Sequence, residues 1–353
     1  MVREMLSLKD KDWEEFYIVD YFTPQRGREG NMTGLSSGDV PLISAKKTDN
    51  GLKAFVNAPI ERLHLGHVIT LNNDGDGGAG LAYFQPFSFA LDTHVTTLRP
   101  IAPLSKQALI FISAAISKQS EKFGHGHAIS NSRLKKMKMM LPINKEGEPD
   151  FTYMADYVSM QEQLLVCKYA TRANEMLDEI GDVECKLPLK EKEWKPFRFN
   201  EIFGEIRRGK RLKKADHLKG EQPYVSSSAS NNGVDAFVSN THKVRKFRNC
   251  ITIANSGSVG KAFFHQYEFV ASDHVTQLKN PAFNRYIYLF LVPVVSRLAE
   301  KYSFNREIND IRINKEIILL PVCDSGKPDW EYMERYAKAI TRNQLKTYLN
   351  HIS

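Results

Sequence analysis

The chain has 353 residues, of which 42% are apolar and 25% charged, and its formal net charge is +8. This composition excludes disordered, collagen-like and membrane-spanning classes, and the length suggests about two domains. The basic excess is typical of proteins with an anionic partner such as nucleic acid. The first residues contain no apolar stretch and the cysteines are widely spaced, so we expect a reducing cytoplasm as the compartment.

In chain order, we expect a mixed, β-rich domain from about residue 13 to 144, with a strand near 67–71 and a helix near 106–118. A second such domain follows from about 194 to 323, with a strand near 250–254 and a helix near 285–301. A longer helix closes each domain. The predicted boundaries are 1–149 and 186–327 for the domains, and 150–185 and 328–353 for the helices.

The second half of the chain repeats the first. VPLISAKKTDNGLKAFV (40–56) returns as QPYVSSSASNNGVDAFV (222–238), and FSFALDTHVTTLRP (87–100) returns as YEFVASDHVTQLKN (267–280). LPINKEGEPDFTYM (141–154) likewise returns as LPVCDSGKPDWEYM (320–333). Similarity that keeps its order and register over such a length indicates a tandem duplication.

The closing helices begin after Asp150 and Asp329, because aspartate is a strong N-cap residue. Apolar residues then recur at helical spacing, and such a stripe needs a partner surface. We expect the two helices to pair as an antiparallel coiled coil, although each could instead pack on its own domain. The expected interface residues are Met154, Tyr157, Leu164, Leu165, Trp330, Met333, Tyr336 and Ile340.

Signatures of catalysis are missing. The sequence has no P-loop, no H-E-x-x-H and no G-x-S-x-G, and the cysteine spacing offers no zinc site, so we expect neither a catalytic nor a metal-binding residue. Asp150 with Glu193 and Lys195 imitates a nuclease pattern, which leaves a Mg²⁺-dependent nuclease as one alternative. A repeat adaptor that binds no DNA is a second alternative. His94 and His274, each in an HVT string, are expected to be structural.

Polar and cationic residues gather in the predicted loops of both repeats, and such loops suit contacts to phosphates and base edges. The two repeats place different residues at matching loops, as two modules that read different ligands would. Candidates in the first domain are Arg26, Arg28, Ser44, Lys46, Lys47, Asn50, Asn72, Asn73, His125 and His127. Candidates in the second are Arg208, Lys210, Arg211, Lys213, Lys214, Ser226, Ser227, Ser228, Asn231, Asn232, Asn255, Asn305 and Arg306.

These motifs resemble the specificity (S) subunits of type I and Bcg-like type IIB restriction–modification systems. The resemblance rests on W-x-x-F-x-x-x-x-x-F (from Trp13 and Trp194), the RG turns, P-x-(I/V)-S and the LP(I/V)…G-x-PD(F/W)-x-YM link to a helix. It covers nearly the whole chain. The chain is short for a type I subunit, with modest helices, and its length is closer to that of the Bcg-like subunits.

The resemblance implies an α+β protein with two target recognition domains, separated by a pseudo-two-fold pair of antiparallel helices. It further implies a non-catalytic DNA-recognition subunit that reads a bipartite asymmetric site and directs partner methyltransferase or nuclease subunits to it. The expected half-sites have about 3–4 base pairs each, with a gap of about 6, since one DNA turn holds about 10 base pairs. S-adenosylmethionine would bind to the partners, with Mg²⁺ in a complex that cleaves DNA, and this chain would hold no cofactor.

Overall fold

The computed structural model describes residues 5–30, 34–75, 78–123, 128–185, 187–303 and 305–352. The chain forms two compact units, residues 1–169 and 170–353, and each is described by itself. None of the helices within the described ranges is long and apolar enough to cross a membrane. Histidines 125 and 127, both candidate DNA-binding residues, lie outside the described residues.

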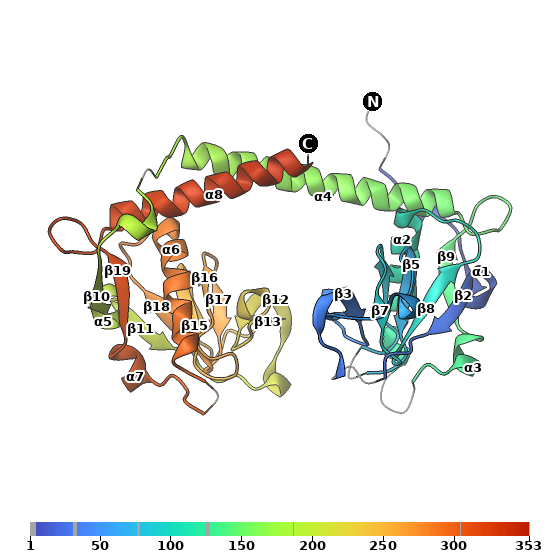
Figure 1. Cartoon of the computed structure of the whole chain (residues 1–353), viewed down its shortest axis with the longest axis horizontal. Coiled ribbons are helices and arrows are strands. Elements are labelled where there is room, and N and C mark those ends of the chain that lie inside the picture. The colour runs from blue at the N-terminus through green and yellow to red at the C-terminus, as the bar shows by residue number, and fades with distance from the viewer. Residues whose placement is uncertain are drawn as a thin grey trace. The chain divides into compact units, whose positions relative to one another are not determined.

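Unit 1 is built on two antiparallel-rich sheets and one short strand pair (Figure 1). The four-stranded sheet has the order β2-β8-β5-β6, and β4-β3-β7 form a three-stranded sheet in which β3 and β7 run parallel. Strands β1 and β9 pair antiparallel, with Trp13 opposite Pro142. The bounds are β1 (Trp13–Tyr17), β2 (Phe22–Arg26), β3 (Ser37–Ile43), β4 (Leu52–Val56), β5 (Val68–Asn72), β6 (Ala82–Gln85), β7 (Ala90–Leu91), β8 (Val95–Pro100) and β9 (Lys138–Pro142).

Helix α2 packs against β6 and β9 of unit 1, because its apolar face carries buried residues such as Leu109 and Ile112. They join one core with Ile69 and Leu71 of β5, which is buried along its whole length. The helices of unit 1 are α1 (Ile18–Tyr21), α2 (Lys106–Ser117) and α3 (Asn131–Leu134), with 3-10 turns η1 (Leu8–Asp10), η3 (Asp49–Gly51), η4 (Ile60–Arg62) and η5 (Ser120–Lys122). Helix α4 (Phe151–Ile180) begins in unit 1, and its last residues belong to unit 2.

Unit 2 has the same plan. Its four-stranded sheets have the orders β11-β18-β15-β16 and β13-β12-β17-β14, and β10 pairs with β19 so that Trp194 lies opposite Pro321. The strands are β10 (Trp194–Arg198), β11 (Glu205–Arg208), β12 (Lys219–Val225), β13 (Val234–Val238), β14 (Lys246–Phe247), β15 (Cys250–Ala254), β16 (Ala262–His265), β17 (Phe269–Ala271), β18 (Val275–Lys279) and β19 (Ile317–Pro321).

Helix α6 covers β15 and β16 of unit 2, as α2 covers β6 of unit 1 (Figure 1). The helices of unit 2 are α5 (Phe199–Ile202), α6 (Arg285–Ser296), α7 (Asp310–Asn314) and α8 (Trp330–Ile352), and the 3-10 turns are η6 (Leu189–Glu191), η7 (Lys214–Asp216), η8 (Asn231–Gly233) and η9 (Arg297–Glu300). The matching strand orders and pairings confirm that the two halves of the sequence encode the same fold.

Both long helices begin where the sequence predicts. The Asp150 carboxylate accepts a hydrogen bond from the Tyr153 N–H at 2.9 Å, and Asp329 accepts one from Tyr332 at 3.0 Å. A lysine pairs with each carboxylate at 2.7 Å, Lys11 with Asp150 and Lys192 with Asp329. Burial alone would raise the pKa of either carboxyl, but the lysine and the backbone N–H lower it below its usual value.

The apolar residues at the starts of these helices serve their own domains, which corrects part of the predicted helix-pair interface. Met154 is fully buried in the unit 1 core with Tyr157 packed beside it, and Met333 is fully buried in the unit 2 core. Trp330 and Tyr336 also pack on the unit 2 core. The reason is that the cap places the first helical turns directly over the domain. Residues further along, Leu164, Leu165 and Ile340, are exposed.

Within unit 2, the end of α4 contacts α8. Ile180 shares the core of unit 2 with Ala337. Asp182, just after α4, forms an ion pair with Arg342 of α8. Pairing of the two helices over their full lengths remains a prediction.

His265 makes unit 2 sensitive to acid. Its side chain is fully buried, with Nε2 2.8 Å from the Thr252 hydroxyl, and burial lowers its pKa from 6.5 to about 4. The unfolded chain therefore binds a proton that the folded state excludes, and stability falls as the pH drops below 6.5 toward 4. Between pH 7 and 5 this group should remove about 2 kcal/mol from the free energy of unfolding.

The repeat supplies the matched variant, because Gln85 occupies the equivalent place in unit 1 and its amide reaches the Thr70 hydroxyl at 3.1 Å. In a Trp13→Phe background, fluorescence reports only Trp194 and Trp330, both in unit 2. Urea unfolding of that protein should lose about 2 kcal/mol more between pH 7 and 5 than its His265→Gln derivative. Equal pH dependence of the two proteins would contradict this role for His265.

Candidate nucleic-acid interface

The RG turn is built identically in both units. Gly27 and Gly209 donate their N–H groups to Val95 and Val275 across the sheet, both at 2.9 Å. Each glycine lies so close to the carbonyl of the facing turn, Asp92 or Ser272, that a Cβ atom would overlap it. The sequence thus requires glycine here, and the turn fixes the direction in which the following basic segment leaves the sheet.

The buried asparagines are structural, which corrects their assignment as base readers. Asn73 and Asn255 are 1% and 2% exposed. Each side-chain oxygen accepts a 2.9 Å hydrogen bond from a threonine of the neighbouring strand in the sheet, Thr96 of β8 or Thr276 of β18. Asn72 is fully buried and donates to the Lys46 and Gly78 carbonyls. They are enclosed because a later loop folds over them: the Ile129 N–H reaches the Asn73 carbonyl at 2.6 Å.

The S-x-x-x-x-x-N loop after β3 is also partly structural. Asn50 and Asn232 adopt φ values of 55° and 52°, a left-handed conformation that asparagine tolerates well. The Asn50 side chain donates to the Phe84 carbonyl at 2.9 Å, and Ser44 is 6% exposed. Lys46 forms an ion pair with Asp49. These residues shape the loop; Ser44 is too buried to read a base, whereas Asn50 remains exposed.

Two of the predicted phosphate-binding arginines are engaged within their own units. Arg208 donates to the Ile308 carbonyl at 3.1 Å and lies 3.2 Å from Asp310. Arg26 donates from Nε to the Thr93 carbonyl at 2.9 Å, although its side chain remains exposed. Arg208 therefore anchors the loop before α7 to the sheet, and its role as a DNA contact stays a prediction.

Other predicted residues remain on the surface. Exposed side chains that keep their candidate role are Arg28, Lys47, Lys210, Arg211, Lys213, Lys214, Asn231, Asn305 and Arg306. Arg306 lies over the Tyr302 ring at 5.5 Å, and the half-buried Ser228 hydroxyl accepts from the Ser230 N–H. In unit 2, four of the exposed cations follow the RG turn in one short run, from Lys210 to Lys214. Exposed positive charge is therefore denser in this segment than elsewhere in the described part of unit 2.

Two histidines that the sequence reasoning treated as structural lie on the surface. His94 and His274 have side chains 56% and 55% exposed, at equivalent turns between β7 and β8 and between β17 and β18. The His94 Nδ1 lies 2.9 Å from Asp74, and the His274 Nδ1 lies 2.6 Å from the Ser256 hydroxyl. The signal that could have found them is the repeated D/S-x-H-V-T string (92–96 and 272–276) among loops whose other residues differ.

In unit 2, His274 belongs to a polar pocket of about 250 Å³. The pocket brings together predicted residues, Lys214, Ser226 and Ser227, with residues that the sequence reasoning missed, His217 and Asp235. The His217 ring lies edge-on to Tyr224 at 4.6 Å, and its Nε2 is buried without a hydrogen-bond partner. Donors and acceptors thus share a small concave surface, which suits hydrogen bonding to the edge of a base.

His94 should make DNA binding depend on pH. The hydrogen bond to Asp74 raises the pKa of His94 above 6.5, despite the opposing effect of burial, so the ring keeps its positive charge to a higher pH. As the pH rises through this pKa, the charge is lost and affinity for a mixed-sequence duplex should fall by about fivefold. Fluorescence anisotropy from pH 6 to 9 measures this change.

Two variants control the experiment. His94→Gln should flatten this part of the pH profile, and Asp74→Asn should shift the fall in affinity to a lower pH, because it removes the carboxylate that raises the pKa. A profile that is unchanged in His94→Gln would show that His94 does not face the DNA.

Among the described residues, no group of three His, Cys, Asp or Glu side chains could hold a metal ion. Asp150 caps α4 and pairs with Lys11, and the exposed Glu193 pairs with Lys195 at 3.2 Å. The imitation of a nuclease motif is therefore explained by helix capping and a local ion pair.

The comparisons identify the family. The chain matches the family model of the type I restriction modification DNA specificity domain twice, over residues 10–165 and 191–351. It belongs to this family and is a specificity subunit of a restriction–modification system, the component that recognises DNA and does not carry out the reaction. It is 32% identical to S.BcgI, the specificity subunit of a type II restriction enzyme of Heyndrickxia coagulans, over 330 residues that cover 92% of this chain and 93% of that protein.

A solved structure shows the same fold at low sequence identity. The S subunit of a type I restriction–modification system from M. genitalium is 15% identical, with a TM-score of 0.50 and coverage of 99% of this chain and 94% of that one. The HsdS subunit from Thermoanaerobacter tengcongensis is 13% identical, with a TM-score of 0.32 and coverage of 96% and 90%.

Proposed function

We propose that this chain recognises a bipartite, asymmetric DNA site, with unit 1 reading one half-site and unit 2 the other. The observation that carries the proposal is one scaffold, present twice, whose equivalent loops hold different polar side chains. The two turns that bring Asp74 and His94 together in unit 1 bring Ser256 and His274 together in unit 2. A shared scaffold with different loop chemistry is what two modules that read different bases require.

We further propose half-sites of about 3–4 base pairs separated by a gap of about 6. Support comes from the length of α4, which has 30 residues and so measures roughly 45 Å at 1.5 Å per residue. Part of that length is used where the helix packs on its own domain, since Met154 is buried there. The remainder corresponds to about one turn of DNA, roughly 34 Å between half-site centres.

The chemistry would belong to partners. In this proposal, methyltransferase or fused restriction–modification subunits bind to the chain and bring S-adenosylmethionine and, where DNA is cleaved, Mg²⁺. The similarity to S.BcgI favours a Bcg-like type IIB system over a type I system. This chain would hold no cofactor of its own, and we expect the complex to act in the cytoplasm. Methylation of a base requires it to leave the stack, so the DNA in the complex should be locally opened.

Binding to a labelled 30-base-pair duplex of mixed sequence tests the proposal against its alternatives. A DNA-reading subunit should bind at 50 mM salt and lose at least about 100-fold in affinity by 200 mM, because contacts to phosphates release counterions from the DNA. An adaptor that does not bind DNA would show no binding at either salt concentration. A nuclease would shorten the duplex with Mg²⁺, and the double variant Asp150→Asn, Glu193→Gln would abolish that cleavage.

A further inference from the structure

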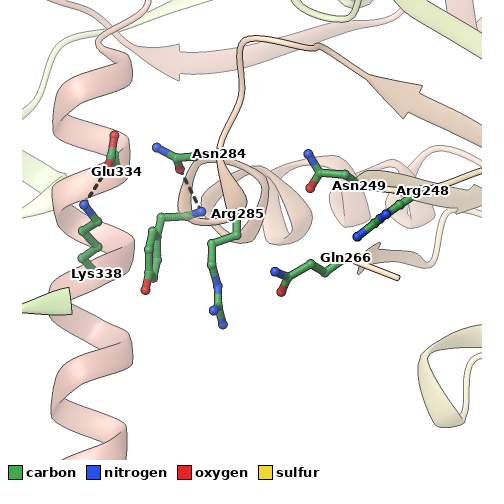
Figure 2. A pocket seen from close by; sticks show the side chains of 8 residues that line it. Arg248, Asn249, Gln266, Asn284, Arg285, Glu334 and Lys338 are labelled. Carbon is green, nitrogen blue, oxygen red and sulfur yellow. Dashed lines mark hydrogen bonds and ion pairs between the residues drawn. The ribbon is translucent and has the colours of Figure 1, made fainter. Parts of the chain in front are cut away.

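A second pocket of unit 2, distinct from the polar pocket, is lined mainly by cations and amides (Figure 2). It has a volume of about 640 Å³. Arg248 and Asn249 reach it from the turn before β15, Gln266 from the turn after β16, Arg285 and Tyr286 from the start of α6, and Lys338 from α8. This volume falls within the range of about 300–1,000 Å³ that small-molecule sites occupy.

The pocket has an excess of positive charge. Arg248, Arg285 and Lys338 face one acidic lining residue, Glu334, which pairs with Lys338 at 2.6 Å (Figure 2). The Asn284 side chain is engaged in capping α6, where it accepts from the N–H groups of Tyr286 and Ile287. The nearest acid to Arg285 is Glu179 at 3.7 Å, an ion pair too long for a good hydrogen bond.

Two donors of this pocket are buried without a partner. The Tyr286 hydroxyl and the Arg285 Nε are buried atoms with no hydrogen-bond partner. Tyr286 as a whole is only 7% exposed. Lys338 and Arg285 lie over the Tyr286 ring, 5.2 and 5.3 Å from its centre, so two positive charges lie close to this side chain. Leaving a buried donor unpaired is unfavourable, and a ligand with acceptor oxygens would supply the missing hydrogen bonds.

The repeat shows that the scaffold does not require these side chains. Asn284 and Ser105 are equivalent helix caps, and so Lys106 and Gln107 stand where unit 2 has Arg285 and Tyr286. Equivalent strand and helix positions give Gly66 for Arg248 and Ser159 for Lys338. His67 stands where unit 2 has Asn249, and its Nε2 lies 2.8 Å from the Leu104 carbonyl. The cationic pocket is therefore an addition of unit 2.

The cationic pocket lies at the opposite end of β15 from the candidate recognition loops. Asn249 precedes the first residue of β15, whereas Asn255, whose backbone N–H donates to the His274 carbonyl at 2.8 Å, follows the last. The five-residue strand separates the two ends by about 17 Å. A ligand in the cationic pocket would not compete directly with a base held at the polar pocket.

From these observations we propose that the cationic pocket binds a phosphate-bearing ligand. Two guanidinium groups, an ammonium group, a phenol and two amides offer many donors and few acceptors, which matches the oxygens of a phosphate. The phosphate could belong to a free phosphoanion or to the backbone of DNA beside the recognised site. Both sources present the same chemistry, and the experiment below separates them.

Calorimetric titration of the full chain with inorganic pyrophosphate, in the absence of DNA, tests the site. Arg248→Gln with Arg285→Gln should weaken binding by about tenfold or more, because it removes two charge-assisted contacts. Tyr286→Phe should weaken it by about threefold to tenfold while leaving the urea midpoint unchanged or higher, because the hydroxyl it removes is unpartnered. Arg297→Gln is the control: its side chain is 74% exposed on η9, directly after the other end of α6.

The DNA arm uses the same variants with the mixed-sequence duplex. Pyrophosphate binding that the pocket variants weaken, together with a DNA affinity and salt dependence that they leave unchanged, indicates a free phosphoanion as ligand. A salt dependence of DNA affinity that the pocket variants reduce by about one unit per contact indicates the DNA backbone. If neither measurement distinguishes the pocket variants from Arg297→Gln, the proposal is wrong. The pyrophosphate titration contains no DNA, so its result does not depend on whether the chain reads a bipartite site.

Discussion

Exchange of residues 192–322 for the equivalent domain of a relative should replace one half-site and leave the other unchanged. Affinity for the original full site should fall by roughly three orders of magnitude, because each wrong base pair costs about 1–3 kcal/mol and a half-site holds several. Affinity for a hybrid site, in which only that half is replaced, should be restored. The measurement is competition binding with the original and hybrid duplexes.

The fold supports this exchange. β10 and β19 are neighbours with Trp194 opposite Pro321, so both junctions of the exchanged segment lie side by side at one end of the domain. The exchanged segment carries most of the unit 2 core, whereas the unit 1 core is separate. Exchange of residues 13–142, between the paired ends of β1 and β9, is the matched control and should alter only the other half-site. A change in both half-sites after either exchange would contradict the modular account.

Removal of the cationic run after the second RG turn should weaken binding to every sequence alike. Lys210, Arg211 and Lys213 are exposed, and contacts to phosphate carry no sequence information. Changing all three to glutamine should lower affinity by about 100-fold at low salt and reduce the slope of log affinity against log salt by about 3. The preferred sequence should remain the same. Anisotropy titrations at several salt concentrations measure both quantities.

A control with equal charge loss separates local contact from net charge. Lys327, Arg335 and Lys346 are exposed cations in the loop before α8 and on α8 itself. Their triple glutamine variant should change the salt slope by much less than the variant of the RG run. Equal slopes for the two triple variants would mean that overall charge, and not the loop after the RG turn, attracts the DNA.

The repeat is the reason that much of the fold could be predicted from one sequence. The strand predicted at 250–254 is β15, and the helices predicted from residues 106 and 285 are α2 and α6. Asp150 and Asp329 cap the long helices as predicted, because capping depends on a local pattern. The helix-pair interface was predicted less well, since an apolar stripe does not say whether a domain or another helix covers it. Met154 and Met333 are covered by their own domains.

The candidate site could be predicted only in part. Composition places asparagine, serine and arginine in loops, but it does not say which of them a later segment will cover. Asn73 and Asn255 are enclosed by residues about 50 positions further along, and Arg208 is engaged by the Ile308 carbonyl, 100 positions away. His94 and His274 were missed for the opposite reason. They follow buried strands in sequence, yet the turn between two strands carries each of them to the surface.

Selection from a library of random duplexes, with the chain in complex with its modification subunit, is the most direct test of the account. The enriched sequences should show two different blocks of about 3–4 fixed base pairs separated by about 6 variable ones. A single uninterrupted block, two identical blocks, or no enrichment above the starting library would contradict the proposal that two related domains read two halves of one site.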